Sequence, residues 1–140
     1  MISYNTDEIK MPVFPKRPVS KWIKQVATDY GKEIGSISII FCSEKKILEI
    51  NATYLNHNYY TDVITFDYSE EKKISADIYI SPETVQTNAL KYRQPYNIEL
   101  YRVIIHAILH LCGINDKTPP QKSEMRIREN AALNLLSQPL

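Results

Sequence analysis

After a proline-rich lead-in, apolar residues recur at intervals of three and four positions between residues 19 and 30. They occupy one face of a helix: Val19, Trp22, Ile23, Val26, Ala27 and Tyr30. Gly31 follows, and glycine commonly ends a helix because it tolerates the left-handed backbone that a C-cap needs. The pattern predicts an amphipathic helix whose apolar face packs against a core.

Three short segments have the character of strands. Residues 36–42 (SISIIFC) and 62–68 (DVITFDY) are rich in β-branched and aromatic side chains, and residues 74–80 (ISADIYI) alternate between apolar and polar positions. Only a short charged stretch separates the last two segments, so we expect them to form a hairpin. Residues 1–5 can add one more strand.

Further helices are predicted by their boundary residues. Serines that can cap a first turn precede three segments: Ser43 before residues 44–56, Ser81 before the segment that starts at Pro82, and Ser123 before residues 124–137. Between these lies a segment from Asn97 to Gly113. From Val103 to Cys112 it is apolar on every side except at two histidines, which is typical of a buried central helix.

The order of these elements predicts an α+β fold. With 140 residues the chain suits one core, so we expect a single domain over residues 1–140. In this prediction a small mixed sheet of three to four strands packs against several helices. The metal site discussed below lies on the buried central helix.

The composition limits the classes of protein without selecting one. Hydrophobic residues make up 44% and charged residues 24%, which argues against a disordered, collagen-like or coiled-coil chain. The net charge of +1 is low for a domain that binds nucleic acid by charge alone, but it does not exclude RNA. No apolar run approaches ~18 residues and no secretory signal is visible, so we expect a cytoplasmic protein without a membrane partner. Cys42 and Cys112 are expected to be reduced.

The two helical histidines belong to a spacing that suits a metal ion. His106 and His110 are four residues apart, so both imidazoles project from the same face of the helix. Gly113 allows the chain to turn back, and Asp116 follows three residues later. Two imidazoles and a carboxylate are suitable ligands for Zn²⁺ or another divalent transition metal, and three protein ligands leave a position open for water. The spacing therefore predicts one catalytic zinc ion.

Each of these residues also has an ordinary structural explanation when it is taken alone. A histidine in a buried helix can be a hydrogen-bonded core residue, Gly113 can be a simple C-cap, and Asp116 can be a loop acid. Zinc proteases have a similar spacing, but they carry a glutamate base directly after the first histidine. Here that position is Ala107, which argues against peptide hydrolysis.

Several motifs together resemble the YbeY family of bacterial rRNA-maturation endoribonucleases. The segment HAILHLCGIND (106–116) is similar to the family signature H-G-x-L-H-L-x-G-Y-D-H. LNHNYYTDVITF (55–66) and ADIYIS (76–81) resemble two further family segments, and Glu124 and Met125 fit before the last helix. The resemblance covers the chain from about residue 36 to the end.

The resemblance implies an α+β enzyme that binds one zinc ion and cleaves single-stranded RNA. In this family the activity is associated with maturation of the 16S rRNA 3′ end and with ribosome quality control. The implied partners are rRNA and the ribosome, and no DNA partner is expected. His106 and His110 match the first two metal ligands of the family, and Asp116 occupies the position of a third histidine. Asn115 stands where the family usually has Asp. It is a candidate to support one of the metal ligands or to contact RNA.

The chain departs from the family before the Thr-Asp-Val motif, where the segment is shorter and lacks the usual arginine. Candidates to replace this phosphate-binding cation are His57, Lys91, Arg93 and Arg102. Asp62 matches the family aspartate, and it either orients the site or pairs locally.

Two alternatives to a ribonuclease remain open at this point. One is a non-catalytic ribosome-assembly factor with a structural metal, and the other is a zinc-dependent hydrolase of another substrate. The sequence gives no indication of the oligomeric state.

Overall fold

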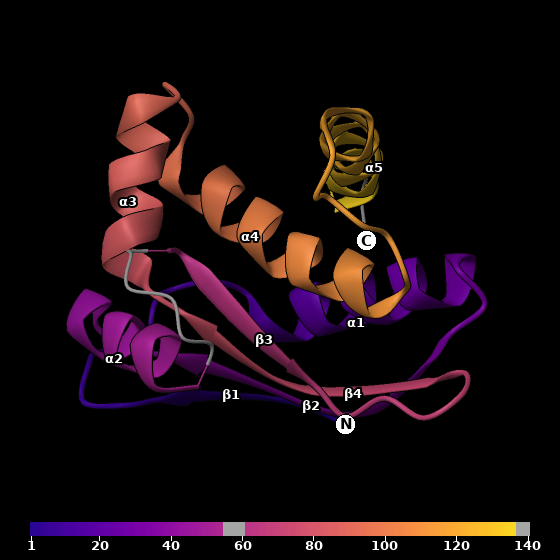
Figure 1. Ribbon diagram of the computed structural model, residues 1–140, viewed down its shortest axis with the longest axis horizontal. Coiled ribbons are helices and arrows are strands. Elements are labelled where there is room, and N and C mark those ends of the chain that lie inside the picture. Colours follow the sequence, from indigo (N-terminus) through magenta and orange to yellow (C-terminus); the bar gives the residue numbers. More distant parts are fainter. Residues whose placement is uncertain (55–60, 137–140) are drawn as a thin grey trace.

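The chain folds into a small α+β domain, as predicted, and its described residues form four strands and five helices (Figure 1). The computed structural model describes residues 1–54 and 61–136. Its elements in chain order are β1 (Ile2–Thr6), α1 (Lys16–Asp29), β2 (Glu33–Phe41), α2 (Glu44–Tyr54), β3 (Val63–Asp67), β4 (Lys73–Ile80), α3 (Pro82–Lys91), α4 (Tyr96–Leu111) and α5 (Pro119–Leu136).

The sheet is mixed, with the strand order β1-β2-β4-β3. Strand β2 is parallel to both of its neighbours, whereas β3 and β4 form the predicted antiparallel hairpin. The predicted additional strand at the N-terminus is confirmed as β1, at one edge of the sheet. The hairpin places Val63 opposite Ile80, so that the residue before β3 and the start of α3 lie at the same end of the sheet.

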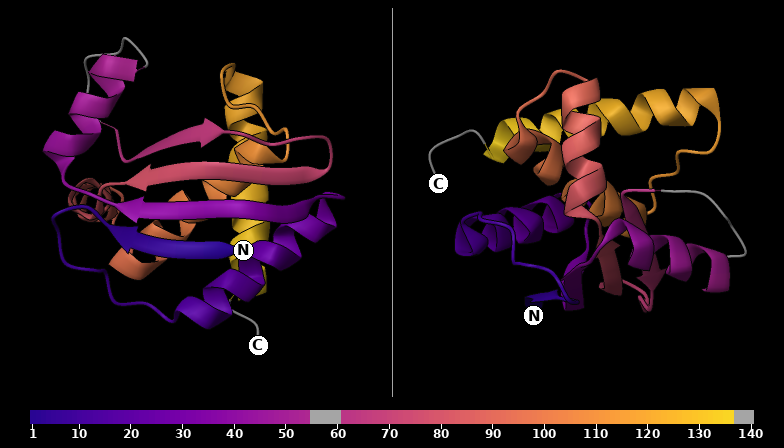
Figure 2. Two further views of the ribbon diagram at one scale, coloured as in Figure 1. Left: turned by 90° about the horizontal axis from the view of Figure 1, so that it is seen from below. Right: turned by 90° about the vertical axis from the view of Figure 1, so that its left-hand side faces the viewer.

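One face of the sheet carries the helical layer. Helices α1 and α4 lie on this face, and α5 crosses over the outer side of α4 (Figures 1 and 2). The opposite face is turned to the viewer in the left panel of Figure 2, and no helix of the described part of the chain lies across it. The main core fills the space between the sheet and the helices, where the inward residues of β2 and β4 meet the apolar sides of α1 and α4.

Helix α4 is the buried central helix that the sequence predicts. Ten of its sixteen residues are buried, and the apolar ones pack between the sheet, α1, α3 and α5. Trp22 of α1 joins this arrangement to the last helix, because its indole Nε1 donates a hydrogen bond of 2.8 Å to the carbonyl oxygen of Ala132 in α5. The position of α5 is thus fixed from α1 as well as from α4.

The start of α5 differs from the prediction. The helix begins at Pro119 and not after Ser123. Thr118 acts as the cap: its hydroxyl accepts from the Gln121 amide at 3.3 Å, and the Gln121 side chain accepts from the backbone amides of Lys117 and Thr118. Because prolines in a first turn lack N–H groups that would otherwise need partners, Pro119 and Pro120 are compatible with this earlier start.

Within residues 1–54 and 61–136, no helix is both long and apolar enough to cross a lipid bilayer.

A substitution in α4 tests the central position of this helix. Ile104 is fully buried, so Ile104→Ala should lower the free energy of unfolding by about 2–5 kcal/mol, through lost burial and a residual cavity. Ile127 on α5 is 60% exposed, and Ile127→Ala should change the free energy by less than about 0.5 kcal/mol. Urea unfolding of both variants measures the difference, and equal losses would contradict the assignment of the core.

Candidate metal centre

The end of α4 brings the two histidines and the aspartate together. His106 and His110 lie one helical turn apart, with ring centroids 4.6 Å from each other. Gly113 then adopts a left-handed φ of +99°. The backbone amide of Ile114 donates a hydrogen bond of 3.0 Å back to the carbonyl oxygen of Leu109. This reversal is the turn that the glycine spacing predicts, and it carries Asp116 back over the histidine face.

The distances between these side chains suit a single metal ion. Asp116 Oδ2 lies 3.3 Å from His106 Nε2, and Asp116 Oδ1 lies 3.3 Å from His110 Nε2. One potential ligand atom from each residue lies within 4.8 Å of the other two. Ligands of a tetrahedral zinc ion, each about 2 Å from the metal, are separated by about 3.3 Å. The donor set and its spacing therefore fit Zn²⁺ or a similar divalent ion.

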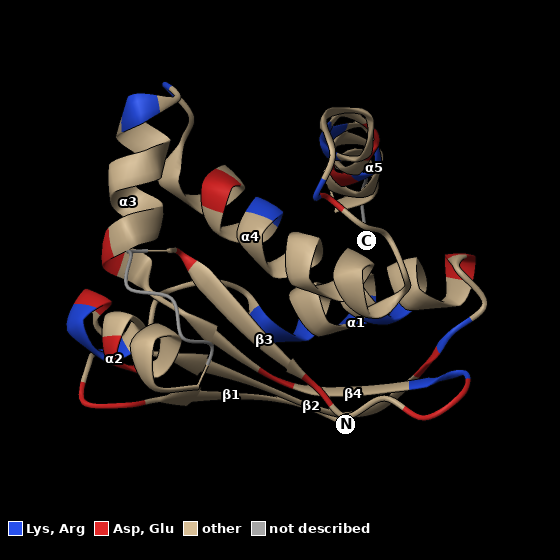
Figure 3. Cartoon of the chain, viewed as in Figure 1, with Lys and Arg blue, Asp and Glu red and all other residues tan. Residues whose placement is uncertain are grey.

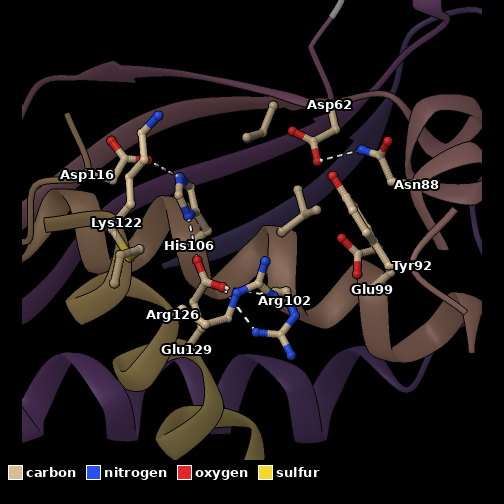
Figure 4. A pocket seen from close by; sticks show the side chains of 13 residues that line it. Asp62, Asn88, Tyr92, Glu99, Arg102, His106, Asp116, Lys122, Arg126 and Glu129 are labelled. Atoms are coloured by element: carbon tan, nitrogen blue, oxygen red, sulfur yellow. Dashed lines mark hydrogen bonds and ion pairs between the residues drawn. The ribbon is translucent and has the colours of Figure 1, made fainter. Parts of the chain in front are cut away.

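Glu129 of α5 contacts the imidazole of His106 on the side away from Asp116 (Figure 4). Its Oε2 lies 2.7 Å from Nδ1 of His106, and its Oε1 accepts from Nη1 of Arg102 at 3.1 Å. Glu129 is only 5% exposed, so this carboxylate is buried between α4 and α5. The bond to Nδ1 fixes the imidazole ring so that Nε2 faces Asp116, which is how carboxylates commonly orient a metal-binding histidine.

The charges around the two histidines move their pKa values in opposite directions. Burial by itself lowers the pKa of His106, but the hydrogen bond and charge of Glu129, together with Asp116, outweigh it and raise the pKa above 6.5. Burial and the neighbouring His106 lower the pKa of His110. Burial alone would raise the pKa of Glu129, but its bond to His106 keeps the pKa below 4.5. The Glu129 carboxylate is therefore held in its ionised form.

A pocket of about 290 Å³ adjoins the cluster. His106 and Asp116 line one part of it, and the other lining residues come from β3, its preceding loop and three helices. Asp62, which precedes β3, accepts a hydrogen bond of 3.3 Å from the amide nitrogen of Asn88 in α3. Its backbone oxygen also accepts from Ser81 N, which ties the loop before β3 to the start of α3. Asp62 thus both pairs locally and lines the pocket.

The remaining sequence candidates have different positions. Arg102 lines the pocket, whereas Lys91 and Arg93 do not. Asn115 is exposed and does not line the pocket, and its role beside Asp116 stays a prediction. His57 lies outside the described residues, and its proposed role stays a prediction.

Sequence reasoning missed several residues of the site: Asn88, Glu99, Lys122, Arg126 and Glu129. Only Glu129 left a recognisable signal, because it is a carboxylate on the inner face of α5 between the buried residues Met125 and Ala132. The other four come from three helices, α3, α4 and α5, and no periodicity in the sequence shows that these helices meet.

Comparisons with known proteins agree on one family. Residues 2–137 match the family model described as Endoribonuclease YbeY. The chain is 57% identical over 137 residues to the protein named Endoribonuclease YbeY of Phocaeicola vulgatus, an alignment that covers 98% of this chain and 99% of that protein. It is 56% identical over 135 residues to the protein of the same name from Parabacteroides distasonis, with coverage of 96% and 95%.

One solved structure supports the fold. The solution structure of TM1509 from Thermotoga maritima superimposes with a TM-score of 0.65, covering 97% of this chain and 89% of that one. At 23% sequence identity this likeness concerns the architecture of the chain alone.

We predict that Glu129→Gln weakens binding of Zn²⁺ by about 10–100-fold, because the neutral amide loses the charge that orients His106 and makes it more basic. Glu124→Gln on the same helix is the control, since Glu124 is exposed and pairs with Arg128 away from the cluster. Competition titrations with a chromogenic chelator measure both affinities. Equal affinities in the two variants would show that Glu129 does not support the metal.

We predict a second effect at Glu99, whose side chain is nearly buried in the pocket. Burial raises the pKa of the Glu99 carboxyl, and the charge of Arg102 opposes the rise only in part. The folded state therefore binds the proton of the Glu99 carboxyl more tightly than the unfolded state does. Ionisation of Glu99 at higher pH then lowers the free energy of unfolding. Glu99→Gln should stabilise the protein at about pH 7, and the gain should shrink toward about pH 4. Urea unfolding at both pH values measures it, and a gain that is independent of pH would refute the explanation.

Proposed function

The chain belongs to the endoribonuclease YbeY family, and from this membership we propose that it is a zinc-dependent hydrolase that cleaves single-stranded RNA. The observation that carries the proposal is the cluster of His106, His110 and Asp116 at the side of a polar pocket. When bound, a zinc ion supplies positive charge for a phosphoryl oxygen and activates water for attack on a phosphodiester. The cluster has the donors that such an ion needs, with Asp116 in the position of the third histidine of the family.

The residues of this chain that would receive the substrate phosphates lie on α5. Lys122 and Arg126 both line the pocket and are exposed, and they are one helical turn apart on the helix that also carries Glu129. Arg102 is mostly buried and donates to Glu129 at 3.1 Å, so it is less available to a phosphate than the exposed Arg126, which lies 3.9 Å from the same carboxylate. We propose that Lys122 and Arg126 together take the role of the arginine that is missing before Thr61.

The substrate that we propose is rRNA, with the 16S 3′ end as the site of maturation and with a related role in ribosome quality control. The support for this assignment is the family to which the chain belongs. A ribosomal substrate places the protein in the cytoplasm with the ribosome as its partner, and no DNA partner is proposed.

A non-catalytic assembly factor with a structural metal is the second candidate. It is favoured by the mixed charge of the site, because three basic and four acidic side chains line the pocket and Figure 3 shows both signs on α4 and on α5. Such a factor would bind RNA without turnover, and chelation would lower its melting temperature strongly. The buried Ala107 gives no support to a peptide hydrolase, because it leaves no general base at that position.

The proposed activity predicts that His106→Ala lowers cleavage of a single-stranded RNA by about a hundredfold or more. Chelation of the metal with EDTA should abolish cleavage by the unmodified protein, and added Zn²⁺ should restore it. Asp29→Asn, an exposed substitution on α1, is the control and should keep full activity. Cleavage assays on a labelled oligonucleotide measure all three effects. Undiminished cleavage by the His106→Ala variant would rule out the metal mechanism, and RNA binding without any cleavage would favour the assembly factor.

A further inference from the structure

The pocket has a second part that the metal cluster does not use. Asp62, Asn88, Tyr92 and Glu99 gather on the side away from Asp116 (Figure 4). They come from the loop before β3, from the end of α3 and from the first turn of α4. This group, which we call the acceptor end, is continuous with the part lined by His106, so one ligand can reach both.

Glu99 is the unusual member of the acceptor end. It is 6% exposed, yet no other described residue makes a hydrogen bond or a close ion pair with its carboxylate. The oxygens of this carboxylate reach the open pocket, while burial of the residue raises the pKa of the carboxyl. Nearby, Nε of Arg102 is a buried donor without a partner among the described residues. Buried polar groups of this kind are usually satisfied by a ligand or by water in the working protein.

Asp62 adds a second acceptor with a fixed direction. The bond from Asn88 engages its Oδ2, and Figure 4 shows the carboxylate at the rim of the same pocket. Both Asp62 and Glu99 present oxygens, so the acceptor end favours a ligand that offers several N–H donors. A small cation is a poorer match, because Arg102 and Arg126 line the same pocket.

The walls of the acceptor end suit a flat ring. Val63 and Val103 supply apolar surface, and Tyr92 is 52% exposed at the rim. Proteins that recognise single-stranded RNA stack unpaired bases on such aromatic side chains and read the base edges through hydrogen bonds. A volume of about 290 Å³ is at the lower end for a ligand site, which suits one base better than a larger ligand.

We propose that the acceptor end binds one base of the RNA beside the bond that is cut, and that it prefers guanine over uracil. This inference rests on the proposed ribonuclease function. Guanine presents two adjacent N–H donors, N1–H and the exocyclic amino group, which match carboxylate acceptors in the same way as a guanidinium does. Uracil presents one N–H between two carbonyl oxygens, and these oxygens would face the carboxylates. The pocket therefore selects against uracil as well as for guanine.

The test compares binding of single-stranded pentamers to the metal-free protein in EDTA, so that no RNA is cut. The probes are the all-uridine pentamer and five variants with one guanosine at each position, and fluorescence anisotropy measures each Kd. One guanosine position should bind about tenfold more tightly than the all-uridine probe. Glu99→Gln should remove most of this advantage, whereas Glu124→Gln should keep it.

Two further measurements separate the base site from a structural role and from the ribonuclease itself. Tyr92→Leu should weaken binding of every pentamer several-fold without changing the ratio between guanosine and uridine, because stacking tolerates any base. An equal Kd for all six probes, or an unchanged ratio in Glu99→Gln, overturns the base site. If the zinc-loaded protein still cleaves RNA in that case, the ribonuclease function stands alone. Absence of both binding and cleavage for every RNA overturns both proposals.

Discussion

The site depends on a contact between two helices, in which a buried carboxylate of α5 meets a histidine of α4. Glu129 bonds to Nδ1 of His106 and to Arg102, and it thereby holds the imidazole in the orientation that faces Asp116. Neither helix can form the centre alone, since α4 supplies the histidines and α5 supplies the group that aims one of them. The energetic cost of burying Glu129 is offset by three basic partners, His106, Arg102 and Arg126, which explains how an ionised side chain remains between the two helices.

The part of this arrangement that is local in sequence could be predicted. The spacing of His106, His110 and Asp116 follows from one helical turn and one glycine reversal, so the sequence alone indicates that the three meet. The hairpin, the buried central helix and the additional N-terminal strand could be predicted for the same reason, because each follows from a short-range pattern. The order β1-β2-β4-β3 depends on long-range pairing, and no segment of the sequence specifies it.

The residues that reasoning from the sequence missed all depend on tertiary contacts. Asn88, Glu99 and Arg126 belong to three different helices, and each taken alone is an ordinary polar residue of its helix. Tyr92 lies just past the end of α3 and is half-exposed, and no short-range pattern assigns it to the pocket. The start of α5 was missed because the cap is Thr118, followed by two prolines, and this signal competes with that of Ser123 five residues later.

The anchoring of α5 by Trp22 has a practical meaning. Trp22 is the single tryptophan of the chain, and its indole contacts the backbone of α5 in the main core, at a distance from the pocket. Detachment of the last helix would break that bond and let water reach the indole. The intrinsic tryptophan fluorescence of the protein therefore reports, without any added label, whether α5 is docked against the rest of the fold.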